Sequence, residues 1–221
     1  MDKLQETTYN DGYMKICENL KKTNQDIKVS FYDRFKRVMD ILLASIGLII
    51  GIPLMIIFGI AIVIETPGGV IYSQDRVGKD GKIFKIYKLR SMVSNAEENC
   101  AQWAEKDDPR VTKVGSFIRK TRIDEIPQLF NVLKGDMSII GPRPERPIFT
   151  EKFNQEIPGF INRLQVKPGL TGWAQVNGGY DITPKEKWEL DMYYIKNRSI
   201  KLDFLIILKT IKVVLTGEGA R

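Results

Sequence analysis

The chain has 221 residues, of which 43% are hydrophobic, and its formal net charge is +7. This length allows one or two domains with a sizeable apolar core. Histidine is absent and only two cysteines occur, which excludes Ser-His-Asp and Cys-His catalytic groups, histidine-bound metals and a disulfide framework. The positive charge predicts an anionic partner, which could be nucleic acid, a lipid surface or a phosphorylated substrate.

The N-terminal 40 residues contain two kinds of segment. Residues 1–30 are polar with balanced charge, and we expect an extension without chemistry of its own. Residues 31–40 mix aromatic with basic side chains. That mixture is typical of a segment that leads into a lipid surface.

Residues 41–64 form an uncharged apolar run between Asp40 and Glu65. As a helix this run would be about 36 Å long, which is enough for a hydrocarbon core of about 30 Å. Pro53 in its middle predicts a kink. Basic residues flank the run on both sides, so we expect a re-entrant helix that breaks at Pro53 and returns to the same side. An ordinary kinked span is the alternative.

In either arrangement, the charged residue at the start of the run needs a partner. Asp40 would lie at the membrane edge, where an unpaired carboxylate is costly. Arg37 is the nearest basic side chain in sequence. We therefore expect Arg37 to be the partner of Asp40.

After Glu65 the pattern changes to that of a mixed α/β chain rich in helices. Alternating side chains predict strands over 70–74 and 83–90, joined by a loop over 77–82 into a short hairpin. Helical patterns cover residues 94–106, 114–121, 125–134, 184–196 and 200–216. The last of these is apolar with interspersed lysines, which suits an amphipathic helix on a membrane surface or a core-facing helix equally well.

Asp124 and Glu125 are the first candidates for chemistry. They fall at the start of the helix predicted over 125–134, which ends at Gly135. Exposed N–H groups and the positive end of the dipole stabilise anions there. An aspartate so placed stays ionised and suits a nucleophile or a Mg²⁺ ligand. Capping of the helix by acidic residues is the structural alternative.

Basic residues accompany this acidic pair. The stretch 110–122 contains no acid, and Arg119 precedes Asp124 by five residues. Arg143 lies between Pro142 and Pro144, which restrict the backbone on either side of it. Cations of this kind suit a phosphate site. A solvated basic face and a structural turn are the alternatives.

The segment 167–178 is rich in small and turn-forming residues. Such residues let a backbone approach a ligand closely, and Trp173, Gln175 and Asn177 could stack on or hydrogen-bond a base or sugar. A structural loop around a buried tryptophan is the alternative. The chain contains neither G-x-x-x-x-G-K-[ST] nor G-x-G-x-x-G, and no zinc-finger or RNA-binding motif. Nucleic acid is therefore not expected as a partner.

Taken in order, these segments resemble the bacterial sugar transferase family, the monotopic phosphoglycosyl transferases. The resemblance covers residues 31–216 and rests on FKRVMD, KIFKIYKLRSM, RKTRIDEIPQLFNVLKGDMSIIGPRP, VKPGLTGWAQVNG and ELDMYYIKNRS. It implies transfer of a sugar-1-phosphate from a UDP-sugar, here UDP-glucose or UDP-galactose, to undecaprenyl phosphate with release of UMP. Such a step begins the synthesis of an exopolysaccharide or capsule at the membrane.

The resemblance also implies roles for individual residues. Asp124 matches the nucleophile that takes the phosphosugar covalently, and Glu125, beside Asp124, matches the residue that helps to hold Mg²⁺. Arg119 and Arg143 match phosphate-binding positions. Lys88, Arg90 and Ser91 match a segment near the same site. The other candidate binding residues, from the two loop segments described above, are Pro142, Pro144, Gln175 and Asn177.

The family's membrane element is a re-entrant helix that breaks near a proline, in agreement with Pro53. Many relatives have Ser-Pro at the break where this chain has Ile52-Pro53, so the serine's contribution is missing. Composition and resemblance together divide the chain into a polar extension over 1–30, a membrane element over 31–65 and a catalytic domain over 66–221. That domain would lie on the cytoplasmic face of the bacterial inner membrane, in contact with membrane lipid.

Three readings stay open after this comparison. The first is the phosphoglycosyl transferase. The second is a glycosyltransferase that moves the sugar alone and releases UDP. The third is a non-catalytic membrane scaffold that binds lipid or partners with its basic surface. A homo-oligomer is also left open.

Overall fold

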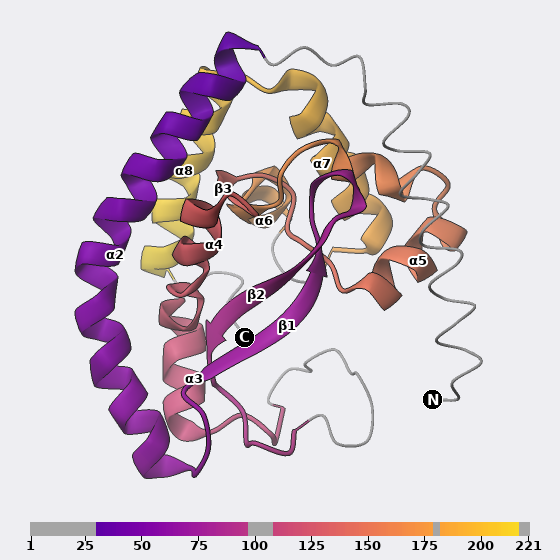
Figure 1. Ribbon diagram of the computed structural model, residues 1–221. Helices are drawn as coiled ribbons and strands as arrows, with labels where there is room; N and C mark the ends of the chain where they lie inside the picture. The colour runs from indigo at the N-terminus through magenta and orange to yellow at the C-terminus, as the bar shows by residue number, and fades with distance from the viewer. Residues whose placement is uncertain (1–29, 97–107, 179–181, 217–221) are drawn as a thin grey trace.

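The computed structural model describes residues 30–96, 108–178 and 182–216 (Figure 1). The extension over 1–30 lies outside this range apart from Ser30, and so does most of the helix predicted over 94–106, of which residues 94–96 form a turn. The described chain is a helix-rich mixed α/β fold with short strands, as the sequence predicts.

Helix α2 (Phe31–Glu65) joins the lead-in and the apolar run into one element. It begins with a capping box in which Ser30 and Asp33 satisfy each other's backbone N–H groups. The helical backbone continues through Pro53 without the expected break. Figure 1 shows α2 bowed instead, with its convex side turned away from the rest of the molecule. A proline removes only one backbone hydrogen bond, which a long helix can absorb by bending.

The two faces of α2 differ in character. The inner face is buried and consists of small, apolar and acidic side chains: Asp40, Ala44, Leu48, Gly51, Gly59 and Ile62. The outer face exposes large apolar side chains, including Val38, Leu42, Ile46, Ile49, Ile50, Ile56, Ile57, Ile60, Val63 and Ile64. By length and composition alone, α2 is sufficient to cross a membrane.

Glycines on the inner face of α2 allow close packing. A Cβ built on Gly51 would lie 2.5 Å from Cγ2 of Ile126, and one on Gly47 would lie 2.9 Å from Cδ1 of Leu129. Real Cβ atoms do not approach so closely. Gly47 and Gly51 therefore serve as contact points for the segment that follows Asp124.

The N-terminal part of α2 is bonded to the rest of the fold. Arg37 donates to the carbonyl oxygens of Val132 and Leu133 at 2.6 and 2.7 Å. Asp40 accepts from Ser138 Oγ and the Ile139 N–H, each at 2.9 Å. The expected pairing of Arg37 with Asp40 is therefore wrong as a hydrogen-bonded pair. Arg37 bonds backbone carbonyls at the end of α4, and Asp40 bonds one side-chain hydroxyl and one backbone N–H, because helix ends and strand edges leave backbone groups unsatisfied.

The C-terminal end of α2 is bonded as well. Glu65 accepts from the N–H groups of Lys113 and Val114 at 2.7 and 2.9 Å. These are the first residues of helix α3 (Lys113–Lys120). A carboxylate at a helix N-terminus satisfies free donors and complements the dipole.

Short strands and helices complete the fold. Strands β1 (Ile71–Val77) and β2 (Ile83–Leu89) form the predicted antiparallel hairpin, with Ile71 opposite Leu89 and Val77 opposite Ile83. Strands β3 (Ser138–Ile140) and β4 (Gly169–Thr171) pair in parallel. The other helices are α4 (Gln128–Lys134), α5 (Pro147–Glu156), α6 (Trp173–Asn177), α7 (Pro184–Asn197) and α8 (Ile200–Thr216). Short 3-10 turns are η1 (Lys79–Gly81), η2 (Ile123–Glu125) and η3 (Phe160–Gln165).

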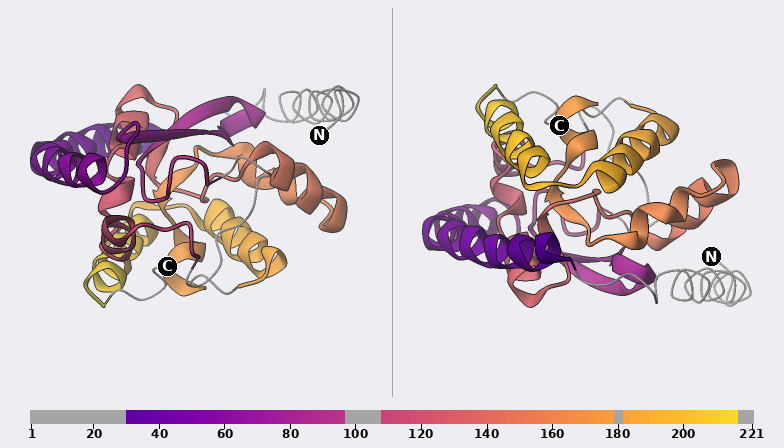
Figure 2. Two further views of the ribbon diagram at one scale, coloured as in Figure 1. Left: turned by 90° about the horizontal axis from the view of Figure 1, so that it is seen from below. Right: turned by 90° about the horizontal axis from the view of Figure 1, so that it is seen from above.

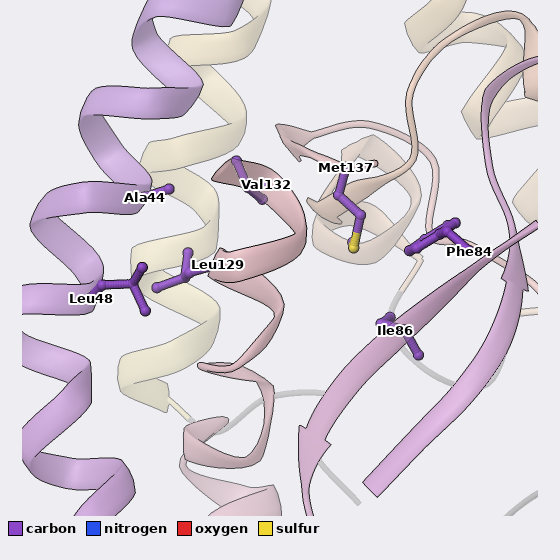
Figure 3. Packing of buried hydrophobic residues seen from close by; sticks show 7 residues of the cluster. All are labelled: Ala44, Leu48, Phe84, Ile86, Leu129, Val132 and Met137. Carbon is purple, nitrogen blue, oxygen red and sulfur yellow. The ribbon is translucent and has the colours of Figure 1, made fainter. Parts of the chain in front are cut away.

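The main apolar core lies between α2, α4 and the hairpin (Figure 3). Ala44 and Leu48 of α2 face Leu129 and Val132 of α4. Phe84 and Ile86 of β2 close the cluster together with Met137. A second cluster joins Ile62, Leu89 and Ile118, and thereby holds α3 against α2 and β2.

Helix α8 lies on the same side of the molecule as α2, whereas α5 projects from the opposite side (Figure 2). In α8, the side chain of Ile206 is completely buried. Its exposed side chains are mostly apolar and include Ile200, Phe204, Leu205, Leu208, Ile211 and Val214. Of the two interpretations of this segment, the exposed apolar stripe favours the amphipathic helix on a lipid surface.

Candidate active site

The carboxylates of Asp124 and Glu125 are buried, at 5% and 8% exposure, in the turn η2. The sequence predicted them at the start of the helix that follows, but α4 begins only at Gln128, after Pro127 as its N-cap residue. The pair thus lies in the 3-10 turn that leads into α4 rather than in the first turn of α4 itself. The charges that favour the ionised carboxylates come from cationic side chains.

The backbone before the pair is strained. Arg122 has φ 60°, in the left-handed region, where a non-glycine residue is uncommon. Such a conformation costs of the order of 1 kcal/mol or more and persists only where the surroundings enforce it. Here it turns the chain from α3 into η2, and the Glu125 N–H then bonds the Arg122 carbonyl at 3.1 Å.

Three predicted cations lie around the carboxylates. Lys88 Nζ is 2.7 Å from Oε1 of Glu125 and 3.6 Å from Oδ2 of Asp124. Arg143 Nη2 is 2.6 Å from the same Oε1. Arg119, in the last turn of α3, contributes a further positive charge that stabilises ionised Asp124. The fold thus brings together β2, the end of α3 and the loop after β3.

The two carboxyl groups differ in acidity. Burial raises the pKa of Asp124 above its ordinary value, with Lys88 opposing the shift and the Glu125 charge adding to it. Burial also disfavours ionised Glu125, but Arg143 and Lys88 more than offset this and hold its pKa well below the usual range. Two adjacent acids whose environments separate their pKa values are a common feature of catalytic sites.

The other predicted site residues bond elsewhere. Arg90 is buried and donates to the carbonyls of Thr66 and Pro67, both at 2.7 Å, so it holds the turn after α2. The Ser91 carbonyl accepts from the Thr112 N–H at 3.2 Å. The part of the chain that the structure describes shows neither side chain bonded to the acidic pair. Their predicted roles in binding stay predictions.

The side chains of Gln175 and Asn177 form hydrogen bonds within their own segment. Gln175 donates to the Leu170 carbonyl at 3.0 Å, and Asn177 donates to the Trp173 carbonyl at 2.8 Å. Lys209 of α8 bonds Asn177 and lies 4.8 Å from the centre of the Trp173 ring. These contacts tie α6 to α8.

Asn131 is a residue whose role the sequence reasoning missed. It is fully buried in α4, donates to the Lys85 carbonyl at 2.8 Å and accepts from the Tyr87 N–H at 3.3 Å. It therefore fixes β2 against α4 immediately before Lys88. A polar residue inside the apolar pattern of 128–134 was the available signal.

The donor set for a divalent metal is small. Within the described residues no group of three or more acidic, cysteine or histidine side chains could hold a metal. Mg²⁺ is often bound through one or two carboxylates together with phosphate oxygens and water. Asp124 and Glu125 therefore fit Mg²⁺ only if a bound phosphate completes the coordination.

An apolar cavity of about 400 Å³ opens beside this site, between α2, the hairpin and the start of α4. Pro127, two residues after Glu125, belongs to its wall. The lining residues are Ile52, Met55, Ile56, Val70, Ile71, Tyr87, Leu89, Pro127 and Phe130. Charged and apolar parts of one ligand could thus bind side by side.

Comparisons with known proteins agree on one family. The bacterial sugar transferase family matches residues 31–217. A UDP-N-acetylgalactosamine-undecaprenyl-phosphate N-acetylgalactosaminephosphotransferase of Aeromonas hydrophila is 53% identical over 193 residues, which is 86% of this chain and 46% of the relative. A UDP-glucose:undecaprenyl-phosphate glucose-1-phosphate transferase of Escherichia coli is 42% identical over 181 residues, 80% of this chain and 39% of the relative.

A third relative is an undecaprenyl-phosphate galactose phosphotransferase of Salmonella typhimurium. It is 42% identical over 200 residues, covering 84% of this chain and 41% of the relative. The chain thus spans less than half the length of each of these three relatives. The family match extends from α2 to the end of α8 and includes the acidic pair with its cations. The chain belongs to the bacterial sugar transferase family.

Proposed function

We propose that the protein transfers a sugar-1-phosphate from a UDP-sugar to undecaprenyl phosphate and releases UMP. The observation that carries this proposal is the buried Asp124–Glu125 pair, which lies among three cations and beside an apolar cavity. The cations suit the phosphate groups of both substrates. The cavity suits the hydrocarbon part of one of them. The names of the relatives support the same reaction.

Asp124 is the proposed nucleophile. Its carboxylate oxygen attacks the sugar-bearing phosphorus of the donor, the bond to the UMP oxygen breaks, and UMP leaves with that electron pair. A phosphate oxygen of undecaprenyl phosphate then attacks the same phosphorus, and the bond to Asp124 breaks. The product is a lipid-linked sugar diphosphate, and Asp124 is free again. A covalent intermediate lets one site handle two bulky substrates in turn.

The remaining charges have distinct roles in this proposal. Lys88 and Arg119 favour the ionised form of Asp124, which burial disfavours, and with Arg143 they bind the transferring phosphate. Glu125 holds Lys88 and Arg143 in place through its Oε1. With Asp124 and the donor's phosphates, Glu125 would also hold Mg²⁺, which neutralises diphosphate charge and favours the departure of UMP.

The relatives favour an N-acetylated donor. The sequence led us to expect UDP-glucose or UDP-galactose. The Aeromonas hydrophila relative named for N-acetylgalactosamine is 53% identical, whereas the relatives named for glucose or galactose are 39% to 45% identical. We therefore propose UDP-N-acetylgalactosamine as the first donor to test, ahead of the two hexoses.

The contacts of α2 support a re-entrant arrangement in the membrane. Arg37 and Asp40 bond one part of the folded domain, and Glu65 bonds α3 of the same domain. A helix that crossed the bilayer could keep such contacts at one end only. The bow of α2 allows both, with its exposed apolar face in the lipid. We propose that both ends and the site lie at the cytoplasmic face of the inner membrane.

The reaction class is tested by a product assay. Purified protein in detergent is incubated with undecaprenyl phosphate, Mg²⁺ and single UDP-sugars, and UMP and UDP are quantified separately. We expect UMP, most rapidly from UDP-N-acetylgalactosamine, and no UMP after chelation of Mg²⁺. Release of UDP would assign the protein to the ordinary glycosyltransferases, and the absence of both nucleotides with every donor would favour a scaffold.

The nucleophile is tested by Asp124→Asn. We expect turnover to fall by about 10⁴-fold or more, because the amide cannot form the acyl phosphate, and labelling by donor carrying ³²P in the sugar-bearing phosphate should disappear. Glu125→Gln should weaken the response to Mg²⁺ while retaining some labelling. The control is Asp75→Asn, which removes an exposed carboxylate from β1. Turnover of Asp124→Asn near the wild-type rate would exclude this role.

The charge of Lys88 should determine the pH below which activity is lost, which is the position of the acid limb of the pH–rate profile. Asp124 must be ionised to attack, and Lys88 lowers its pKa. In Lys88→Gln the pKa of Asp124 rises further, so activity is lost at a higher pH as the solution is acidified. Lys85→Gln, an exposed lysine on the same strand, should leave the limb in place. An unchanged limb in Lys88→Gln would show that Asp124 does not titrate there.

Topology is tested with single cysteines. Ser30→Cys and Gly69→Cys are introduced separately into a chain whose Cys17 and Cys100 are replaced by serine. A membrane-impermeant maleimide should label both only in inverted membrane vesicles. Labelling of the two positions from opposite sides would demonstrate a true span.

A further inference from the structure

The loop that carries Arg143 is held at four consecutive carbonyl oxygens. The Pro142 carbonyl accepts from the Gly169 N–H at 2.9 Å and the Glu145 carbonyl from the Val77 N–H at 2.9 Å. Between them, the Arg143 carbonyl accepts from Arg163 Nη2 at 2.8 Å, and the Pro144 carbonyl accepts from Arg76 Nη1 at 3.2 Å. Segments far apart in sequence thus fix one short loop.

Arg163 is the charged partner buried among these contacts, at 2% exposure in η3. Its Nε and Nη2 both donate to Oδ2 of Asp191 in α7, at 3.0 and 2.6 Å. Its guanidinium also lies 5.0 Å from the centre of the Phe160 ring. The bidentate contact and the ring leave Arg163 Nη2 aimed at the Arg143 carbonyl.

The surroundings balance the charge of Arg163. Asp191 is 1% exposed and accepts from both nitrogens. Glu145, in the same loop as Arg143, has its Oε1 3.9 Å from Arg163 Nη1 and also binds Lys187 of α7. A buried ionic network of this kind adds little to stability compared with apolar packing of the same volume, but its directional hydrogen bonds fix the groups that it joins.

We propose that Arg163 and Asp191 are positioning residues for Arg143. Arg163 acts through the backbone: it fixes the Arg143 carbonyl, and the two flanking prolines restrict the torsion angles that remain. The guanidinium of Arg143 is thereby directed at Oε1 of Glu125, 2.6 Å away. The pair thus links α7 to the phosphate site without contact with a substrate. The expected effect of this pair on kcat rests on the proposed function, whereas its effect on the conformation of the loop 141–146 does not.

The test uses Arg163→Lys. A lysine can pair with Asp191 but cannot also reach the Arg143 carbonyl in the fork geometry of a guanidinium. Arg110→Lys is the matched control, because Arg110 also donates through Nε and Nη2 to a buried aspartate, Asp108, and through Nη1 to a backbone carbonyl, that of Ala96. Melting temperatures in detergent establish that each variant is folded.

The readout is a double-mutant cycle on UMP release with Arg143→Ala. We expect Arg163→Lys alone to lower kcat by about 10- to 100-fold, since small misplacements of a charged group have effects of this size. In the Arg143→Ala background the same change should lower kcat by less than about twofold, because the group it positions is gone. An equal loss in both backgrounds, or a loss of the same size in Arg110→Lys, would overturn the proposal.

A second measurement does not require turnover. Hydrogen–deuterium exchange should become faster in Arg163→Lys in the peptide that contains 141–146 and at the amides of Val77 and Gly169, which bond that loop. Unchanged exchange there would overturn the proposal even if the protein released no UMP. Absence of UMP from the wild-type protein, together with faster exchange in the variant, would instead refute the proposed function and leave the loop assignment intact.

Discussion

The structure depends on keeping two adjacent carboxylates buried. An isolated ionised acid in a protein interior is unfavourable by several kcal/mol, and two neighbouring ones repel each other. The molecule resolves this by giving Glu125 two cations on one oxygen, whereas Asp124 has Lys88 at 3.6 Å and interacts electrostatically with Arg119 and Arg143. Glu125 is consequently the fixed anion of the site. Asp124 is the less stabilised of the two, in keeping with its proposed role as the nucleophile.

Each cation comes from a different element, and each element is fixed by a separate interaction. Asn131 bonds β2 on either side of Ile86 and so places Lys88. Glu65 bonds the first N–H groups of α3, the helix that ends with Arg119. The four bonded carbonyls hold the loop of Arg143. The three cations of the site are thus positioned by three separate sets of contacts. Two of these sets, those of Asn131 and of the Arg143 loop, are buried hydrogen bonds, and leaving such groups partly unsatisfied lowers stability.

The sequence predicted the hairpin, α7, α8 and the grouping of Asp124, Glu125, Lys88, Arg119 and Arg143, because periodicity and family motifs report on local structure and chemistry. It did not predict that the acids precede α4 or that Arg37 and Asp40 bond backbone groups. Those outcomes depend on tertiary contacts between residues about 95 positions apart. Arg163 and Asp191 carry no local signal either, since a charged residue in a helix or turn ordinarily lies in water.

The inner face of α2 connects the membrane element to the chemistry. Gly51 and Gly47 admit Ile126 and Leu129, the residues directly after the acidic turn, to within van der Waals contact of the helix backbone. The same helix bonds the C-terminal carbonyls of α4 through Arg37 and the N-terminus of α3 through Glu65. A helix bonded in this way cannot shift along its axis without moving both neighbours of the carboxylates. Because the outer face of α2 is apolar from Ile41 to Ile64, insertion of this face in lipid would also place the site at the lipid surface.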